Sequence, residues 1–220
     1  MPKYYLGVDP GLTHTGLALI DEQDRLLGVA LVLVKPTAKM KLSLGFKKKV
    51  ETTNYKLGII FARVQQEIND MLTSNDVSID DATVVIEGFW YRPESAKNRK
   101  MANYIYETIS GVAAAKCALM QLKLSYNDIM PIQVKRVISW LSDGVPSIEL
   151  GKEDVETKVR KIVGDAQVDK FLGEYATGYH QHLSDAIAIA LCAKGMSAYE
   201  EYMKIPLKKR KQMQANAKTN

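Results

Sequence analysis

The chain has 220 residues, 46% of them hydrophobic, which suits a single domain of the larger kind with a substantial core. These figures exclude a wholly disordered chain, a collagen-like repeat and a small disulfide-stabilised fold. The net charge of +5 comes from the C-terminal end, because the residues from Lys204 onward include six basic side chains and no acidic one. The longest apolar stretch, residues 26–34, is far shorter than the roughly 18 residues of a membrane span. Asp9 also comes too early for a secretory signal, so we expect a cytoplasmic protein without a membrane partner.

The first 53 residues have the pattern of an antiparallel meander followed by a loop. Strands are expected over 4–8, 15–20 and 26–34, where β-branched and apolar residues are bounded by turn residues. The polar residues 21–25 join the second and third strands. Residues 35–53 have no clear period and many lysines, which predicts a long basic loop or an extended hairpin.

Helices and strands alternate through the rest of the chain. Apolar residues at helical spacing predict a helix over 54–72, and a β-branched run predicts a buried strand over 83–87. The elements expected after this strand are a helix over 96–120, a strand over 122–129, and helices over 131–140, 152–163 and 180–193. This order predicts an α/β fold whose mixed sheet begins as a meander and continues through parallel crossovers.

We expect one domain over residues 1–197, with two additions. Residues 165–179 lie between two predicted helices and look like an insertion within the domain, whereas residues 198–220 look like a flexible basic tail. The two cysteines, Cys117 and Cys192, have apolar neighbours and are expected to be buried, reduced thiols.

Basic side chains gather in three stretches of a chain that is otherwise close to neutral. The first is the tail, and the second is residues 35–56, where seven lysines face one acidic residue and a cluster is formed by Lys47, Lys48 and Lys49. The third stretch combines one acidic residue with Arg92, Lys97, Arg99 and Lys100. Such stretches predict a polyanionic partner, because a lysine beside a phosphate releases condensed counterions. Solvated surface charge is the alternative for each stretch, and acidic lipid is less favoured because the tail lacks an apolar face.

Four residues able to bind a metal stand at strand ends or at a helix start. Asp9 ends the first strand, and Glu87 ends the most hydrophobic strand. His182 and Asp185 are three residues apart at the start of the last helix, so they share one face. If these elements are neighbours, the carboxylates converge, and converging carboxylates repel one another unless a cation is bound. Oxygen donors with a single imidazole favour Mg²⁺ or Mn²⁺ over structural Zn²⁺.

Each of these features also has a simpler explanation. An ordinary turn and an exposed rim charge explain the two strand-end carboxylates, and helix capping by Ser184 or a favourable dipole interaction of Asp185 explains the helix start. The joint occurrence of the four residues on this strand pattern favours the metal site. Of the other histidines, His14 is expected to be a loop residue without a role, and His180 to be close enough to serve as a spare ligand.

Three segments resemble the acidic motifs of the RuvC Holliday-junction resolvases, within the RNase H-like superfamily. They are residues 6–11 (LGVDPG) with the following Thr15-Gly16, residues 85–87 (VIE) and residues 182–190 (HLSDAIAIA). Residues 96–98 (AKN) and 133–135 (QVK) are further matches, and Lys152 falls where the family carries a second basic residue. The resemblance covers about residues 4–163 and 180–194.

The resemblance implies an RNase H-like fold, with a mixed five-stranded sheet flanked by helices. It also implies a homodimeric endonuclease that resolves four-way junctions by symmetric nicking, and that acts on other branched DNA such as three-way junctions and flaps. Hydrolysis would use two Mg²⁺ ions per active site, with Mn²⁺ able to substitute. The implied roles are metal binding for Asp9, Glu87, His182 and Asp185, and phosphate contact for Lys135 and Lys152.

Several departures from the family pattern point to a divergent, phage-encoded branch with a broader substrate range. His182 stands where many relatives have aspartate, although some relatives also have histidine. The lysine-rich residues 35–49, the insertion over 165–179 and the basic tail are longer than the compact cellular enzymes need.

Three aromatic residues directly follow the strand that ends at Glu87: Phe89, Trp90 and Tyr91. A hydrophobic plug beneath the next helix is one interpretation of these rings. The other is a surface loop beside the metals, whose rings stack on bases exposed at a branch point while the neighbouring basic residues contact phosphate. On the second interpretation the DNA-binding set comprises Phe89, Trp90, Tyr91, Arg92, Lys97, Arg99, Lys100, Lys47, Lys48 and Lys49.

Three other functions stay open at this point. An actin-like ATPase would explain the motif around Asp9, but it needs two related subdomains and a second phosphate-binding loop. A noncatalytic protein that binds branched DNA keeps the fold without the chemistry. An RNase H-like nuclease could also act on RNA–DNA hybrids or serve as a transposase.

Overall fold

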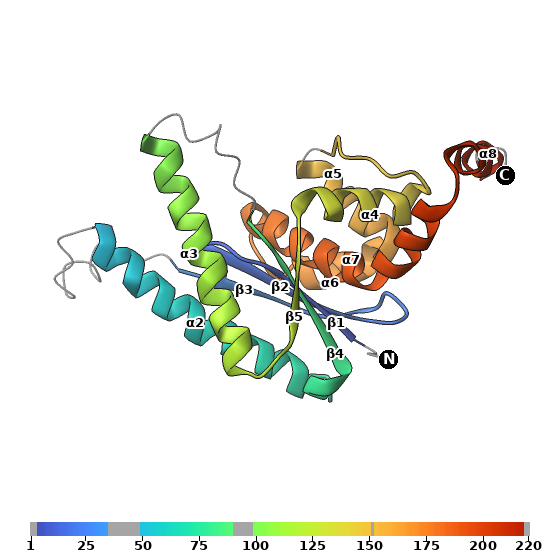
Figure 1. Ribbon diagram of the computed structural model, residues 1–220. Helices are drawn as coiled ribbons and strands as arrows, with labels where there is room; N and C mark the ends of the chain where they lie inside the picture. Colours follow the sequence, from blue (N-terminus) through green and yellow to red (C-terminus); the bar gives the residue numbers. More distant parts are fainter. Residues whose placement is uncertain (1–3, 35–48, 90–98, 151, 218–220) are drawn as a thin grey trace.

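The computed structural model describes residues 4–34, 49–89, 99–150 and 152–217. A five-stranded sheet crosses the centre of the molecule, with helices against both of its faces (Figure 1). Its strands, in the order β3-β2-β1-β4-β5, are β3 (Leu26–Leu33), β2 (His14–Asp21), β1 (Tyr4–Asp9), β4 (Ala82–Glu87) and β5 (Tyr126–Ile129). The strands β1, β2 and β3 pair antiparallel, whereas β4 runs parallel to both β1 and β5. The predicted α/β fold with a mixed sheet is confirmed.

Helices divide between the two faces of the sheet. Helices α2 (Lys49–Ser74) and α3 (Arg99–Gln121) cover one face, and the other carries α4 (Pro131–Asp143), α5 (Lys152–Val163), α6 (Asp165–Leu172) and α7 (His180–Lys204). Each face has its own apolar core. The central strands supply both cores by alternation, since Val84 and Ile86 of β4 point to the first face and Val85 to the second. Among the described residues no helix is long and apolar enough to cross a bilayer.

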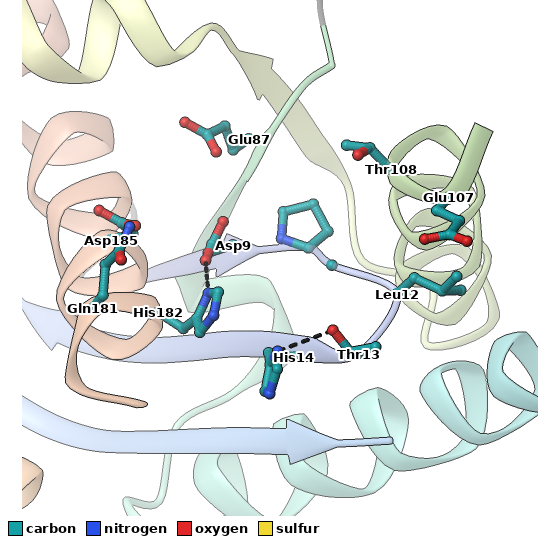
Figure 2. Close-up of a pocket in the computed structure, with 12 residues that line it drawn as sticks. Asp9, Leu12, Thr13, His14, Glu87, Glu107, Thr108, Gln181, His182 and Asp185 are labelled. Carbon is teal, nitrogen blue, oxygen red and sulfur yellow. Dashed lines mark hydrogen bonds and ion pairs between the residues drawn. The ribbon is translucent and has the colours of Figure 1, made fainter. Parts of the chain in front are cut away.

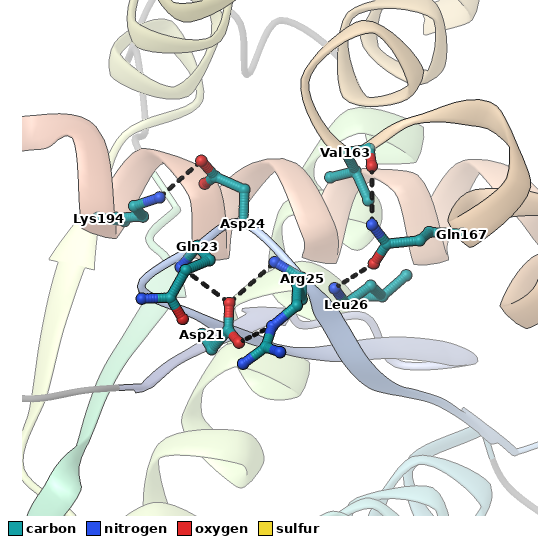
Figure 3. Close-up of polar contacts among 8 residues, drawn as sticks. All are labelled: Asp21, Gln23, Asp24, Arg25, Leu26, Val163, Gln167 and Lys194. Carbon is teal, nitrogen blue, oxygen red and sulfur yellow. Dashed lines mark hydrogen bonds and ion pairs between the residues drawn. The ribbon is translucent and has the colours of Figure 1, made fainter.

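The β2–β3 hairpin is fixed by a buried carboxylate (Figure 3). Asp21 accepts hydrogen bonds from the backbone N–H groups of Gln23 and Arg25, both at 2.9 Å, and from the Arg25 guanidinium at 2.5 Å. Burial raises the pKa of Asp21, but these hydrogen bonds and the charge of Arg25 outweigh it, so the pKa lies below its ordinary value. Lys194 of α7 holds the same turn through Asp24, at 2.6 Å. The turn therefore ties the hairpin to the helix that carries two of the predicted ligands.

Some boundaries differ from those predicted. Helix α2 begins at Lys49, inside the predicted loop 35–53, and its Thr53 is buried. Strand β5 begins only at Tyr126, because the chain turns before it, with Lys123 in the left-handed region at φ 59°. Cys117 is exposed on α3 rather than buried, whereas Cys192 is buried as predicted.

The C-terminal third is more ordered than the sequence pattern suggested. Residues 165–179, predicted to be an insertion, form α6 and a short turn of helix, Thr177–Tyr179, and α6 contributes Val168 and Leu172 to the core. Helix α7 runs past its predicted end at 193 and through the proposed domain boundary at 197. A last helix, α8 (Leu207–Ala217), lies within residues 198–220, the predicted tail. The division into domain and tail stays a prediction, but the backbone has no break at residue 197.

Candidate active site

Two parallel strands carry carboxylates to the same edge of the sheet. Val8 is paired with Ile86, so Asp9 and Glu87, the next residues of β1 and β4, both stand at the C-terminal ends of neighbouring strands. The loop after Asp9 is closed by Thr15, whose hydroxyl group donates to the carbonyl oxygen of Gly11 at 3.1 Å. The loop also packs closely against α3, because a Cβ at Gly111 would lie 2.8 Å from the Leu12 nitrogen.

Helix α7 reaches these carboxylates because two glycines let it approach the sheet. A Cβ at Gly7 would lie 2.2 Å from the Ala186 carbonyl oxygen, and one at Gly16 would lie 2.2 Å from that of His182. Only glycine leaves room for a helix backbone at this distance. The close approach sets His182 and Asp185, in the first turns of α7, beside the strand ends (Figure 2).

The four predicted ligands line one pocket, with a volume of about 350 Å³. Figure 2 shows Asp9, Glu87, His182 and Asp185 on the side formed by the strand ends and α7, while Glu107 and Thr108 come from α3. Its complete lining is Asp9, Pro10, Gly11, Leu12, Thr13, His14, Glu87, Glu107, Thr108, Gln181, His182 and Asp185. The structure therefore brings together the four residues that the sequence proposed as one site.

The carboxylates of this pocket repel one another. Burial, followed by the charges of Asp9 and Asp185, raises the pKa of Glu87 from 4.5 to about 8, although Lys135 acts in the opposite direction. Asp9 is also drawn to His182, whose Nδ1 lies 3.2 Å from its Oδ2. With its pKa at about 8, the Glu87 carboxyl is mainly protonated at neutral pH while no cation is bound.

This donor set fits a hard divalent cation. Carboxylate oxygens and one imidazole are donors that Mg²⁺ and Mn²⁺ accept, and a cation would relieve the repulsion that raises the Glu87 pKa. In their present positions, no group of three or more His, Cys, Asp or Glu side chains among the described residues is close enough to hold a metal ion.

His14, expected from the sequence to be a loop residue without a role, lines the pocket beside His182. Its ring stacks on that of His182, with centroids 4.9 Å apart and planes inclined by 12°. The His14 ring also lies near the Tyr179 ring, with a centroid distance of 5.6 Å. Thr13 holds His14 in turn, with its Oγ1 3.0 Å from Nδ1. His14 begins β2 while His182 belongs to α7, so only the fold brings the rings together. Glu107 and Thr108 line the pocket outside the proposed ligand set, on a long helix without a motif.

His180 and the two predicted phosphate-binding lysines take different positions. The Nε2 atom of His180 lies 3.0 Å from the Tyr175 carbonyl oxygen, and His180 does not line the pocket. Lys135 donates from Nζ to the Leu150 carbonyl oxygen at 2.7 Å, near enough to Glu87 to lower its pKa. Lys152 begins α5, two residues after Leu150, but its side chain lies outside the described part of the chain.

Of the predicted DNA-binding set only Phe89 has a described side chain. It is half-buried and lines a second pocket of about 410 Å³, together with Ile109 and Val112 of α3. Lys49, Arg99 and Lys100 belong to helices whose first side chains are not described. The others lie outside the described residues altogether: Lys47, Lys48, Trp90, Tyr91, Arg92 and Lys97.

Comparison with known proteins gives matches among solved structures, of which two are described below, but no match by sequence. No protein-family model matches the chain, and no curated protein matches it. A structure of Thermus thermophilus RuvC in complex with a Holliday junction substrate is similar with a TM-score of 0.55 and 22% identity, over 89% of this chain and 95% of that one. A second *T. thermophilus* RuvC structure is similar with a TM-score of 0.51 and 22% identity, over 90% and 96% of the two chains. The chain therefore has a RuvC-like, RNase H-like fold, as its motifs predicted, while phage origin stays a prediction.

Proposed function

We propose that the protein is a metal-dependent endonuclease that cleaves branched DNA, with four-way junctions as its main substrate. The observation that carries this proposal is the convergence of Asp9, Glu87, His182 and Asp185 on one pocket, at the end of two parallel strands of a RuvC-like fold. A Holliday junction substrate is bound in one of the similar structures, which supports branched DNA as the ligand class.

In this proposal the four residues hold Mg²⁺, two ions per site, or Mn²⁺ in its place. Bound divalent cations supply Lewis acidity for phosphodiester hydrolysis. Asp9 is oriented by its hydrogen bond to His182, and the stacked His14 ring supports the His182 ring. Lys135 is held by the Leu150 carbonyl oxygen and offers a fixed positive charge beside Glu87, where an entering phosphate would lie.

Symmetric nicking would need two such pockets, because one pocket faces one phosphodiester at a time. We therefore also propose a homodimer, in which each copy cuts one strand of the junction. If both copies of the dimer bind one junction at the same time, the two nicks would lie at related positions across the branch point.

Two competing functions are less well supported. In this chain, glycines let α7 approach the sheet closely, and this approach sets three carboxylates and a histidine in one pocket. A noncatalytic DNA-binding protein has no need for such a pocket. A nuclease specific for RNA–DNA hybrids shares the same chemistry, so substrate competition has to separate it. The actin-like ATPase needs two related subdomains, whereas the described residues form one five-stranded sheet.

One gel experiment tests the proposal. Four-way junction, three-way junction, flap, linear duplex and RNA–DNA hybrid would each be incubated with Mg²⁺, Mn²⁺ or EDTA. We expect paired nicks in the four-way junction with either metal, weaker cleavage of the other branched substrates, and no cleavage in EDTA. Preferential cleavage of the hybrid or linear duplex would contradict the proposal, as would junction binding without any cleavage.

A further inference from the structure

Helix α8, within the stretch 198–220 that was predicted to be a basic tail, contacts the end of α7. Arg210 of α8 donates from Nε to the Ile205 carbonyl oxygen at 2.9 Å, and its guanidinium lies over the Tyr202 ring at 5.6 Å. Tyr202 is buried and packs on Trp140 of α4, with ring centroids 5.4 Å apart. Arg210 thus connects α8, through one aromatic ring, to the helices on that face of the sheet.

This attachment leaves three lysines on the outside. Residues 208–211 are Lys-Lys-Arg-Lys, and no acidic residue follows Glu201 in the sequence. Arg210 is half-buried, whereas Lys208, Lys209 and Lys211 are exposed and form no ion pair within the described residues. Lys204, by contrast, is paired with Glu201 at 2.5 Å. The exposed lysines therefore form a fixed concentration of uncompensated positive charge.

The length of α7 indicates how far this positive charge lies from the pocket. Helix α7 carries the pocket residue His182 in its first turn and ends at Lys204, and α8 lies beyond this end (Figure 1). At about 1.5 Å per residue, this part of α7 spans roughly 33 Å. One turn of B-form DNA is about 34–36 Å, or about 10 base pairs.

We propose that α8 binds the phosphate backbone of a duplex arm, about one helical turn from the phosphodiester that is cut. Phosphate contacts fix the position of a duplex without reading its sequence. The helix would therefore favour junctions whose arms are long enough to reach it, regardless of base composition. This inference rests on the proposed function, because it takes the pocket as the point of cleavage.

The test compares two arm lengths and two pairs of lysines. Four-way junctions would carry arms of either 16 or 7 base pairs, the short arms closed by hairpin loops so that they stay annealed. At about 3.4 Å per base pair the short arms extend only roughly 24 Å and cannot reach α8. Lys208→Gln/Lys211→Gln removes two charges one helical turn apart on α8. Its matched control, Lys123→Gln/Lys170→Gln, removes two exposed lysines from other surfaces.

Junction affinity would be measured in EDTA over a range of salt concentrations, with cleavage in Mg²⁺ measured alongside. Wild type and the control pair should bind long arms more tightly than short arms. The α8 pair should lose that preference, and its slope of log Kd against log salt on long arms should fall by about 1.8, at about 0.9 per phosphate contact. Cut positions should not change. An α8 pair that keeps the wild-type slope and arm preference would overturn the inference.

Arg210→Ala separates a fixed helix from a flexible basic tail. It keeps all three exposed lysines but removes the contact with Tyr202. Without this contact the lysines can move to bind a short arm, so the preference for long arms should shrink. An unchanged preference would contradict presentation by an anchored helix. Failure of the proposed function is distinguishable, because wild type would then cleave junctions of neither arm length, whether or not it binds them.

Discussion

Replacing Gly16 with alanine should displace the candidate metal ligands of α7 without altering any of them. The new Cβ would lie 2.2 Å from the His182 carbonyl oxygen, whereas close carbon–oxygen contacts are about 3.3 Å. The obstacle is backbone, so no rotamer change relieves it, and the first turn of α7 has to move away from the sheet by about 1 Å. A misplacement of about 1 Å at a catalytic centre can lower the rate by roughly 100-fold. We therefore expect junction nicking by Gly16→Ala to fall by about two orders of magnitude.

The assay would follow nicking of a four-way junction in Mg²⁺ under single-turnover conditions, together with junction binding in EDTA and thermal unfolding. Overpacking should cost about 1–3 kcal/mol of stability, which leaves the protein folded at the assay temperature, and metal-free binding should change little. Gly58→Ala is the matched control, because a Cβ at this position of α2 meets nothing within 4 Å. It should be neutral or stabilising by about 1 kcal/mol. Wild-type nicking by a folded Gly16→Ala variant would refute the argument that glycine sets the position of α7.

Three further predictions concern single residues. His14→Ala should raise the Mg²⁺ concentration needed for half-maximal nicking and half-maximal thermal stabilisation, whereas His14→Phe should restore both, because the ring face supports His182; equal behaviour of the two variants would exclude that support. Because the pKa of Glu87 is raised to about 8, the Mg²⁺ concentration needed for half-maximal stabilisation should fall as pH rises from 6 to 8. Glu87→Gln should abolish this trend, and a trend that persists in the variant belongs to another group. The lowered pKa of Asp21 means that its ionised form stabilises the fold above its ordinary value of 3.8, and that this contribution is lost as pH falls through the lower folded-state value. Asp21→Asn should therefore lower Tm at pH 7 by more than it does in acid; an equal loss at both pH values would show that the charge is not what stabilises the turn.

The strand-end carboxylates could be predicted because local sequence determines their position. Apolar runs that stop at Asp9 and Glu87 mark the ends of buried strands, and parallel pairing then places both at one edge. The three-residue spacing of His182 and Asp185 likewise fixes a shared helix face. The positions of these side chains follow from the repeat of a strand or of a helix alone. The RuvC-like motifs indicate, in addition, the order of these elements along the chain.

The features that escaped prediction depend on contacts between distant segments. Nothing local to His14 indicates that it stacks on a residue of α7. The extension of α7 to Lys204 depends on Tyr199 and Tyr202 packing against Trp140, a contact that no local pattern contains. Because α7 is buried on several sides, its apolar residues lack the one-sided period that usually marks where an amphipathic helix continues.

The most direct test of the central claim compares two carboxylates of the same pocket. Glu87→Gln removes a proposed metal ligand at the end of β4, whereas Glu107→Gln makes the same chemical change on α3, outside the proposed ligand set. Nicking of a four-way junction in Mg²⁺ would be measured for both variants at equal junction occupancy. The proposed site predicts that Glu87→Gln binds the junction but does not nick it, while Glu107→Gln retains most of the wild-type rate. Nicking by Glu87→Gln at the wild-type rate would contradict the assignment of this pocket as the active site.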